Sequence, residues 1–137
     1  MAIWAIVPAA GVGSRLGGPV PKQYLPLLGR TVVERSIDCL LAIPGVERVV
    51  VAIGANDVYW QKLPCAQHPR VTVVTGGSER QSSVLNALRS IHAEAKSEDW
   101  VLVHDAVRPC VKSEDIENLI DRVKDDEVGG LLASLMD

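Results

Sequence analysis

The residues best suited to chemistry lie in a glycine-rich stretch near the start of the sequence. It reads Pro-Ala-Ala-Gly-Val-Gly-Ser-Arg from residue 8 to residue 15 and follows an apolar run that ends at Val7. Glycines let a backbone turn tightly and approach a ligand, and consecutive N–H groups in such a loop form a concave anion site. Arg15 and Lys22 add positive charge, and no acidic residue precedes Glu34. The pattern predicts a cradle for a triphosphate. The loop residues expected to line it are Pro8, Ala9, Ala10, Gly11, Gly13 and Ser14.

Two better-known phosphate loops do not match this stretch. The dinucleotide fingerprint needs a third glycine at residue 16, which is Leu, and no acid follows a second strand as that fingerprint also requires. A nicotinamide oxidoreductase is therefore disfavoured. A P-loop is excluded because the loop lacks Gly-Lys-Ser/Thr. The alternative for Arg15 and Lys22 is ordinary solvated surface charge.

A second motif, Gly-Gly-Ser-Glu-Arg-Gln-Ser-Ser-Val, runs from residue 76 to residue 84. Gly77 would bring backbone groups close to a ligand, and Ser83 would add a hydroxyl, which together can read the edge of a pyrimidine. Ser78 and Arg80 are further nucleotide-binding candidates in this segment. A plain helix N-terminus with serines in its first turn remains the alternative.

The third motif is Val-His-Asp-Ala-Val-Arg-Pro, residues 103–109. Asp105, just past an apolar strand, is suited to Mg²⁺ or to a ribose hydroxyl. Arg108 offers a planar fork for a phosphate, or for Asp105 itself. A turn stabilised by an Asp105–Arg108 pair is the alternative. His104 is expected to orient its neighbours.

Together, Pro-Ala-Ala-Gly, Pro-Lys-Gln-Tyr at residues 21–24 and the second and third motifs resemble the 2-C-methyl-D-erythritol 4-phosphate cytidylyltransferases. The resemblance implies transfer of a cytidylyl group from CTP to methylerythritol phosphate, with Mg²⁺, in non-mevalonate isoprenoid synthesis. It implies catalytic roles for Arg15 and Lys22, and cytosine contacts at Gly77 and Ser83. It implies ribose, metal or acceptor contacts at Ala9–Gly11, Asp105, Ala106 and Arg108. Ser78 stands where some members carry Asp.

The sequence departs from the family at its end. It reads Leu-Leu-Ala-Ser-Leu-Met-Asp from residue 131, without the expected Pro-Val-x-Asp-Thr. The family's dimer-forming β-arm and later acceptor-binding residues have no counterpart, so we expect a truncated chain with the nucleotide half of the site. The alternatives are a ribitol-5-phosphate cytidylyltransferase, which shares these loops, and a catalytically incompetent CTP-binding fragment.

The elements that must position these motifs alternate between strand and helix. Strands are predicted at 3–7, 48–53, 71–74 and 100–103, with a further apolar run at 128–135. Helices are predicted from Thr31, from Ser78 and from Ser113, with capping boxes at Thr31–Glu34 and Ser78–Gln81, and a short one at 57–63. This alternation predicts an α/β fold: a Rossmann-like three-layer sandwich around a mostly parallel sheet, the nucleotidyltransferase fold. The loops after residues 7, 74 and 103 then meet at one edge of the sheet.

Composition limits the remaining possibilities. The 137 residues suit one domain, and a net charge of −3 argues against nucleic-acid and anionic-membrane partners. The three cysteines are far apart and show no metal-ligand spacing, so we expect reduced thiols in a cytoplasmic protein. No signal peptide or membrane span is expected.

Overall fold

A four-stranded parallel sheet organises the computed structural model, which describes residues 2–10, 20–108 and 112–123. Its strands are β1 (Ile3–Ala9), β4 (Val46–Ile53), β5 (Val71–Thr75) and β6 (Trp100–Val103), in the order β5-β4-β1-β6. All three pairings are parallel, which confirms the predicted sheet. The strands β1, β4 and β5 reach one or two residues beyond their predicted ends, and β6 has the predicted bounds. The extension of β1 carries Pro8 and Ala9 directly to the site.

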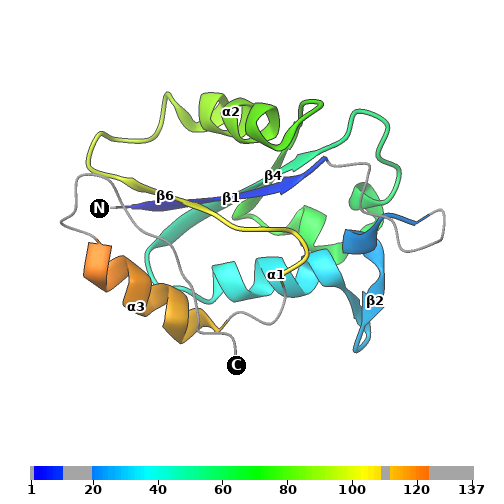
Figure 1. Ribbon diagram of the computed structural model, residues 1–137, viewed down its shortest axis with the longest axis horizontal. Helices are drawn as coiled ribbons and strands as arrows, with labels where there is room; N and C mark the ends of the chain where they lie inside the picture. The colour runs from blue at the N-terminus through cyan, green and yellow to red at the C-terminus, as the bar shows by residue number, and fades with distance from the viewer. Residues whose placement is uncertain (1, 11–19, 109–111, 124–137) are drawn as a thin grey trace.

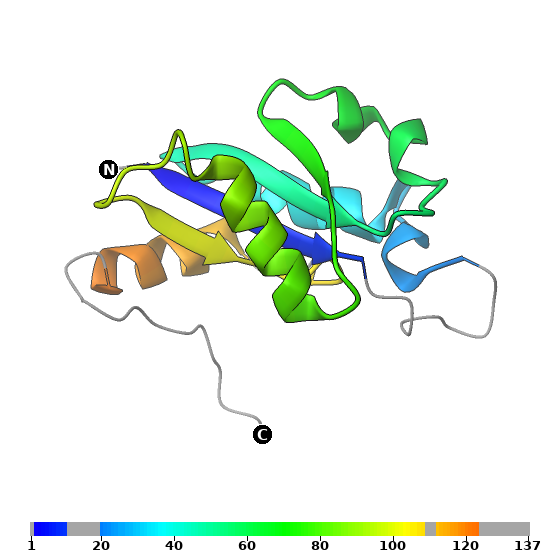
Figure 2. The same ribbon diagram turned by 90° about the horizontal axis from the view of Figure 1, so that it is seen from above.

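Helices cover both faces of the sheet (Figure 1). The helix α2 (Arg80–Ile91) lies on one face, while α1 (Val32–Leu41) and α3 (Ser113–Val123) lie on the other. Seen from above, α2 runs across the sheet beside β1 (Figure 2). The three-layer α/β sandwich is therefore confirmed.

The hydrophobic core divides into two parts because β1 and β4 bury both of their faces. Trp4, Ile6 and Val50 pack under α2 against Ala87 and Ile91. The opposite side chains of the same strands pack against α1 and α3, and this larger cluster includes Val7, Val51, Ile37, Leu40 and Ile116. Burial on both faces explains why these strands read as continuous apolar runs.

The helix starts follow the sequence in one case and differ in another. Thr31 accepts the Glu34 amide N–H at 3.3 Å, and the Glu34 carboxylate accepts the Thr31 N–H at 3.2 Å, which confirms that capping box. The Ser78–Gln81 box is wrong: Glu79 occupies the N-cap of α2, and no side chain caps it. Ser113 lies within α3, and its side chain is outside the described residues, as is the apolar run at 128–135.

Short elements that the sequence did not predict join the strands and helices. A 3₁₀ turn, η1 (Lys22–Tyr24), leads into a hairpin of β2 (Pro26–Leu27) and β3 (Arg30–Thr31). Leu28 and Gly29 both have positive φ, as a tight two-residue hairpin turn requires. The helix predicted at 57–63 is instead the 3₁₀ turn η2 (Trp60–Lys62), followed by η3 (Pro64–Gln67). Pro64 prevents a longer helix, because a proline disfavours helical backbone at the residue before it, here Leu63.

Among the described residues, none of the helices is long and apolar enough to cross a membrane.

Candidate functional site

A cavity of about 320 Å³ lies at the carboxyl edge of the sheet. It lies at the topological switch point between β1 and β6. The chain passes from β1 through α1 to β4 on one side of β1, and it reaches β6 on the other side through α2. Ligands of open parallel sheets bind in such a crevice. All three predicted loops contribute to the cavity wall. The residues that line it are Pro8, Ala9, Gln23, Gly77, Ser78, Glu79, Arg80, Ser83, Asp105, Ala106 and Val107.

The first wall comes from the end of β1 and from η1. The side-chain amide of Gln23 donates a hydrogen bond to the Ala9 carbonyl at 2.8 Å, and Gln23 is only 5% exposed. Ala9 lies near the start of the glycine-rich stretch, before its glycines, and Gln23 lies after the stretch, so this bond ties together residues on either side of those glycines. Sequence reasoning did not assign Gln23 to the site; its place in the Pro-Lys-Gln-Tyr motif was the available signal.

The second wall is the turn from β5 into α2, and it needs both glycines. A Cβ at Gly76 would lie 2.5 Å from the Ala10 Cβ and 2.6 Å from the Ser83 Oγ. A Cβ at Gly77 would lie 2.2 Å from the Ser82 Cβ. Ser83 is buried, and its hydroxyl oxygen accepts the Gly77 amide N–H at 3.1 Å. The wall therefore presents closely packed backbone and one buried hydroxyl, together with the N-terminus of α2, which favours anions.

The third wall carries a small cluster of charges around Asp105. Arg80, at the start of α2, forms an ion pair with one carboxylate oxygen of Asp105. The Arg108 guanidinium lies 3.5 Å from the other oxygen, so the Asp105–Arg108 pair that the sequence left open is present. The side chains of Arg80 and Arg108 are 57% and 72% exposed, so solvent weakens both pairs and a ligand can compete for either cation. Sequence reasoning did not anticipate the Arg80–Asp105 pair, because the two residues are 25 positions apart.

The loop that carries Asp105 is held from below and from its own far end. Ser36 of α1 is fully buried and donates its hydroxyl to the Ala106 carbonyl at 2.9 Å. A ring nitrogen of His104 lies 3.0 Å from the Arg108 carbonyl oxygen, consistent with the orienting role expected for His104. Burial lowers the pKa of His104 below its usual value, although the contact to Arg108 opposes this. The neutral imidazole therefore donates this hydrogen bond at pH 7.

Of the remaining predicted site residues, two lie within the described ranges and the others lie outside them. Lys22 is exposed on η1, and within the described ranges no carboxylate forms an ion pair with its ammonium. Ala10 lies beside Gly76. Gly11, Gly13, Ser14 and Arg15 lie outside the described residues, so their predicted roles remain untested.

The carboxylates at the cavity limit how a metal ion could be held. In the part of the chain that the structure describes, no three His, Cys, Asp or Glu side chains gather as a metal site. Asp105 and the exposed Glu79 are the acids that line the cavity. Such a set cannot form an all-protein cage, but it suits an ion that substrate phosphates hold together with one carboxylate, as Mg²⁺ commonly is.

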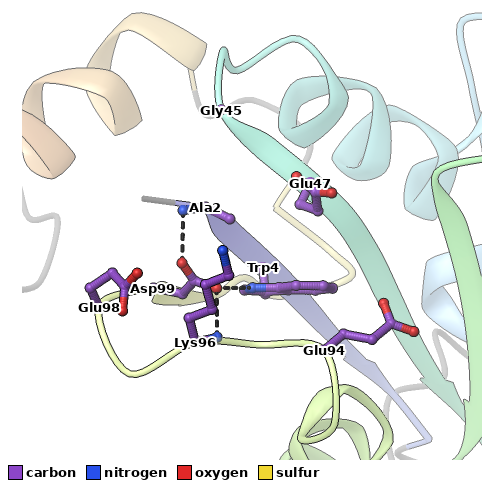
Figure 3. Close-up of a pocket in the computed structure, with 8 residues that line it drawn as sticks. All are labelled: Ala2, Trp4, Gly45, Glu47, Glu94, Lys96, Glu98 and Asp99. Carbon is purple, nitrogen blue, oxygen red and sulfur yellow. Dashed lines mark hydrogen bonds between the residues drawn. The ribbon is translucent and has the colours of Figure 1, made fainter.

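A second cavity, of about 390 Å³, lies at the opposite edge of the sheet, around Trp4 and Asp99 (Figure 3). Asp99 is fully engaged there: it accepts the Ala2 N–H at 2.9 Å, the Trp4 indole N–H at 3.0 Å and the Lys96 N–H at 2.8 Å. These bonds join the start of β1 to the turn before β6 (Figure 3). Although this cavity is larger, its central carboxylate serves the fold, and the candidate site is the cavity at the carboxyl edge.

Comparison with known proteins shows which family the chain resembles. The family model described as 2-C-methyl-D-erythritol 4-phosphate cytidylyltransferase matches residues 3–137. Proteins of that name from Pseudomonas fluorescens Pf-5 and Pseudomonas putida W619 are 51% and 53% identical over 133 residues, which is 96% of this chain and 57% of each relative. The chain thus spans little more than half the length of these relatives.

A solved structure gives the same likeness in three dimensions. The crystal structure of the 2-C-methyl-D-erythritol 4-phosphate cytidylyltransferase of Francisella tularensis superposes with a TM-score of 0.74 at 36% identity. The match covers 93% of this chain and 54% of that structure.

Proposed function

The chain belongs to the 2-C-methyl-D-erythritol 4-phosphate cytidylyltransferase family, and on that premise we propose that it binds CTP in the carboxyl-edge cavity for cytidylyl transfer. The acceptor is 2-C-methyl-D-erythritol 4-phosphate, and the products are 4-diphosphocytidyl-2-C-methyl-D-erythritol and pyrophosphate. The observation that carries this proposal is the meeting of three separate sequence motifs around one cavity. Their residues are up to 99 positions apart in the chain, from Pro8 to Val107, so chance clustering is a poor explanation.

The reaction needs charge neutralisation more than acid–base chemistry. A phosphate oxygen of the acceptor attacks the α-phosphorus of CTP, the bond from that phosphorus to the bridging oxygen breaks, and pyrophosphate leaves with the electron pair. The attacking oxygen is already ionised at pH 7, since the second pKa of a phosphate monoester is about 6. No general base is therefore required. Cations that stabilise the transferring phosphoryl group and the leaving group lower the barrier.

The residues of this chain divide the work as follows. Gly77 and Ser83 face the base, and the N-terminus of α2 with Arg80 faces the phosphates. Lys22, which has no acidic partner in the described residues, supplies charge to the triphosphate together with Arg15. Arg108 exchanges its contact with Asp105 for the phosphate of the acceptor.

Magnesium is the metal that this proposal includes. Asp105 would hold it together with the triphosphate oxygens, because a single carboxylate with substrate phosphates suits this ion. When bound, the ion neutralises phosphate charge. With the ion bound, the Asp105 carboxylate would pair less strongly with Arg80 and Arg108, and both guanidinium groups would be available to phosphates.

The alternative hypotheses and the remaining predictions from the sequence are supported to different degrees. Ribitol 5-phosphate as the acceptor is not favoured, since the relatives described above are named for methylerythritol phosphate. The fragment hypothesis stays open to experiment, because the chain matches 57% of the relatives' length. A cytoplasmic location and a homodimer are further proposals; Cys65, a buried thiol, is consistent with a reducing compartment.

The test measures two quantities on this chain. Calorimetry with CTP and Mg²⁺ reports binding, and release of pyrophosphate in the presence of each acceptor reports turnover. Binding with turnover on methylerythritol phosphate supports the whole proposal, and binding without turnover supports the fragment hypothesis. Failure to bind CTP at all contradicts the proposal.

One substitution tests the proposed role of Lys22 itself. We predict that Lys22→Ala lowers turnover on the order of 100- to 1,000-fold, as removal of one transition-state donor commonly does. If the chain binds without turnover, the readout is its affinity for CTP. Lys62→Ala, which changes an exposed lysine on η2, is the matched control and leaves both quantities unchanged. Unchanged turnover and affinity in Lys22→Ala would remove Lys22 from the mechanism.

A further inference from the structure

Lys22 is exposed, yet the residues that follow it are among the most firmly held at the carboxyl edge. The 3₁₀ turn η1 has three residues, of which Gln23 is 5% exposed and Tyr24 is 6% exposed. A turn of this length has no stability of its own, because nucleating a helix costs more than one hydrogen bond returns. Something outside η1 must therefore fix where Lys22 stands.

Tyr24 makes the decisive contact, and its partner is Asp57 in the loop after β4. The Tyr24 hydroxyl donates to one carboxylate oxygen of Asp57 at 2.5 Å. The ring of Tyr24 also stacks on the ring of Tyr59, with centroids 5.0 Å apart and planes inclined by 28°. Burial and the neighbouring carboxylate raise the pKa of the Tyr24 hydroxyl, so it stays protonated and keeps donating.

The carboxylate of Asp57 is itself held rigidly. Its other oxygen accepts the amide N–H of Tyr59 at 2.8 Å and that of Trp60 at 2.9 Å. The Asp57 amide donates to the Gly54 carbonyl at 3.1 Å, close to the end of β4. The chain of contacts thus runs from the sheet through Asp57 to Tyr24. Gln23 adds a separate tie from the same turn to Ala9 at the end of β1.

We propose that Asp57, acting through the Tyr24 hydroxyl, is a positioning residue that fixes Lys22, whose neighbour Gln23 lines the nucleotide cavity. This inference rests on the proposed function, in which Lys22 contacts the triphosphate. Asp57 touches no nucleotide in this arrangement; it fixes the backbone from which Lys22 extends. A displaced charge stabilises phosphates less well, because catalytic and binding groups must be held to fractions of an ångström.

Tyr24→Phe is the sharpest variant, since it removes one oxygen and keeps the ring and its stacking. The affinity for CTP with Mg²⁺ is measured for the unchanged chain, Tyr24→Phe, Lys22→Ala and the double variant. We expect Lys22→Ala to weaken CTP binding about tenfold or more, as loss of a charged contact does. Tyr24→Phe should weaken it about threefold to tenfold, within the usual range of coupled neighbours. The double variant should bind no more weakly than Lys22→Ala alone.

Cytidine, which has no phosphates, distinguishes positioning of Lys22 from a general structural effect. A general structural effect would weaken the binding of cytidine as well as that of CTP. Positioning of Lys22 predicts that Tyr24→Phe weakens binding of CTP but not of cytidine. Asp57→Ala, which removes the acceptor, should behave in the same way and add nothing to Tyr24→Phe. Amide exchange at Leu25, whose N–H donates to the Lys22 carbonyl at 3.2 Å, should quicken in both variants while exchange in β4 stays unchanged.

The outcomes separate the inference from the function on which it rests. If the wild-type chain does not bind CTP, both the positioning role of Asp57 and the proposed function are overturned. CTP binding with multiplying losses in the double variant, or equal losses for CTP and cytidine, overturns the positioning role of Asp57 alone. Unchanged CTP affinity in Tyr24→Phe overturns it as well.

Discussion

At the scale of single residues, closely packed backbone forms the wall of the site at the turn from β5 into α2. The sequence predicts that Gly77 and Ser83 contact the base, and both line the cavity. It could not identify the purpose of Gly76, because the atoms that exclude a side chain there belong to Ala10 and Ser83. Ala10 is 66 positions away in the chain, so only the fold brings it there.

We predict that Gly76→Ala lowers the free energy of unfolding by about 1–3 kcal/mol, the usual cost of overpacking. It should also weaken CTP binding, since the new methyl group would meet Ala10 at 2.5 Å and Ser83 at 2.6 Å. Urea unfolding and calorimetry with CTP measure the two effects.

Gly54→Ala is the matched control, because its Cβ would meet nothing closer than 3.8 Å. A Gly76→Ala chain as stable as Gly54→Ala, with the same affinity for CTP, would contradict the role given to Gly76.

At the scale of elements, periodicity predicted what has a strong local signal. The four strands and the capping box at Thr31 were found because buried β-branched runs and reciprocal caps are visible in a few neighbouring residues. The Ser78 box failed although its residue types fit: the backbone of Gly76 and Gly77 turns against Ala10 and Ser82, and α2 begins two residues later, at Arg80. The helix predicted at 57–63 is instead the turn η2, before which the Asp57 carboxylate accepts the N–H groups of Tyr59 and Trp60.

Contacts between elements were beyond the reach of sequence reasoning. Ser36 reads as a polar residue of an amphipathic helix, yet it is fully buried beneath the loop of Asp105. Its partner, the Ala106 carbonyl, is 70 positions away. Ser36 is how α1 fixes the third wall of the cavity, although it lines none of that wall itself.

Ser36→Ala should therefore cost about 1–3 kcal/mol of stability, because a buried carbonyl is left without its donor. We also expect weaker CTP binding, since Ala106 and Asp105 lose their support from α1. Chemical unfolding and calorimetry provide the two measurements.

The same change at Ser90 in α2 is the control. Its hydroxyl donates to the Ala87 carbonyl within its own helix, away from the cavity. Equal effects of Ser36→Ala and Ser90→Ala on CTP affinity would show that the bond to Ala106 does not serve the site.

At the scale of the whole molecule, the two edges of the sheet have different tasks. The carboxyl edge exposes glycine turns and unbalanced cations, whereas the amino edge is closed by Asp99, whose carboxylate joins Ala2, Trp4 and Lys96 (Figure 3). The hydrogen bonds of Asp99 stabilise the amino edge and can stay intact when a nucleotide binds at the carboxyl edge.

The role of Asp99 at the amino edge predicts how the stability of the fold depends on pH. Hydrogen bonds from the Lys96 and Ala2 amides, and then from the Trp4 indole, lower the pKa of Asp99 to about 2. The folded state thus binds this proton less readily than the unfolded chain, where the pKa of an aspartate is about 3.9. The stabilisation is complete above about pH 4 and is lost as the pH falls from there towards 2. Asp99→Asn should therefore unfold more easily than the unchanged chain at pH 7, and the difference between them should shrink across that interval. Urea midpoints recorded at several pH values measure it, with Glu98→Gln, which changes an exposed acid of the same turn, as the matched control. If the difference in urea midpoint between Asp99→Asn and the wild-type chain did not change between pH 4 and pH 2, the carboxylate charge would not hold the amino edge together. CTP binding at pH 7 should be the same in the wild-type chain, Asp99→Asn and Glu98→Gln.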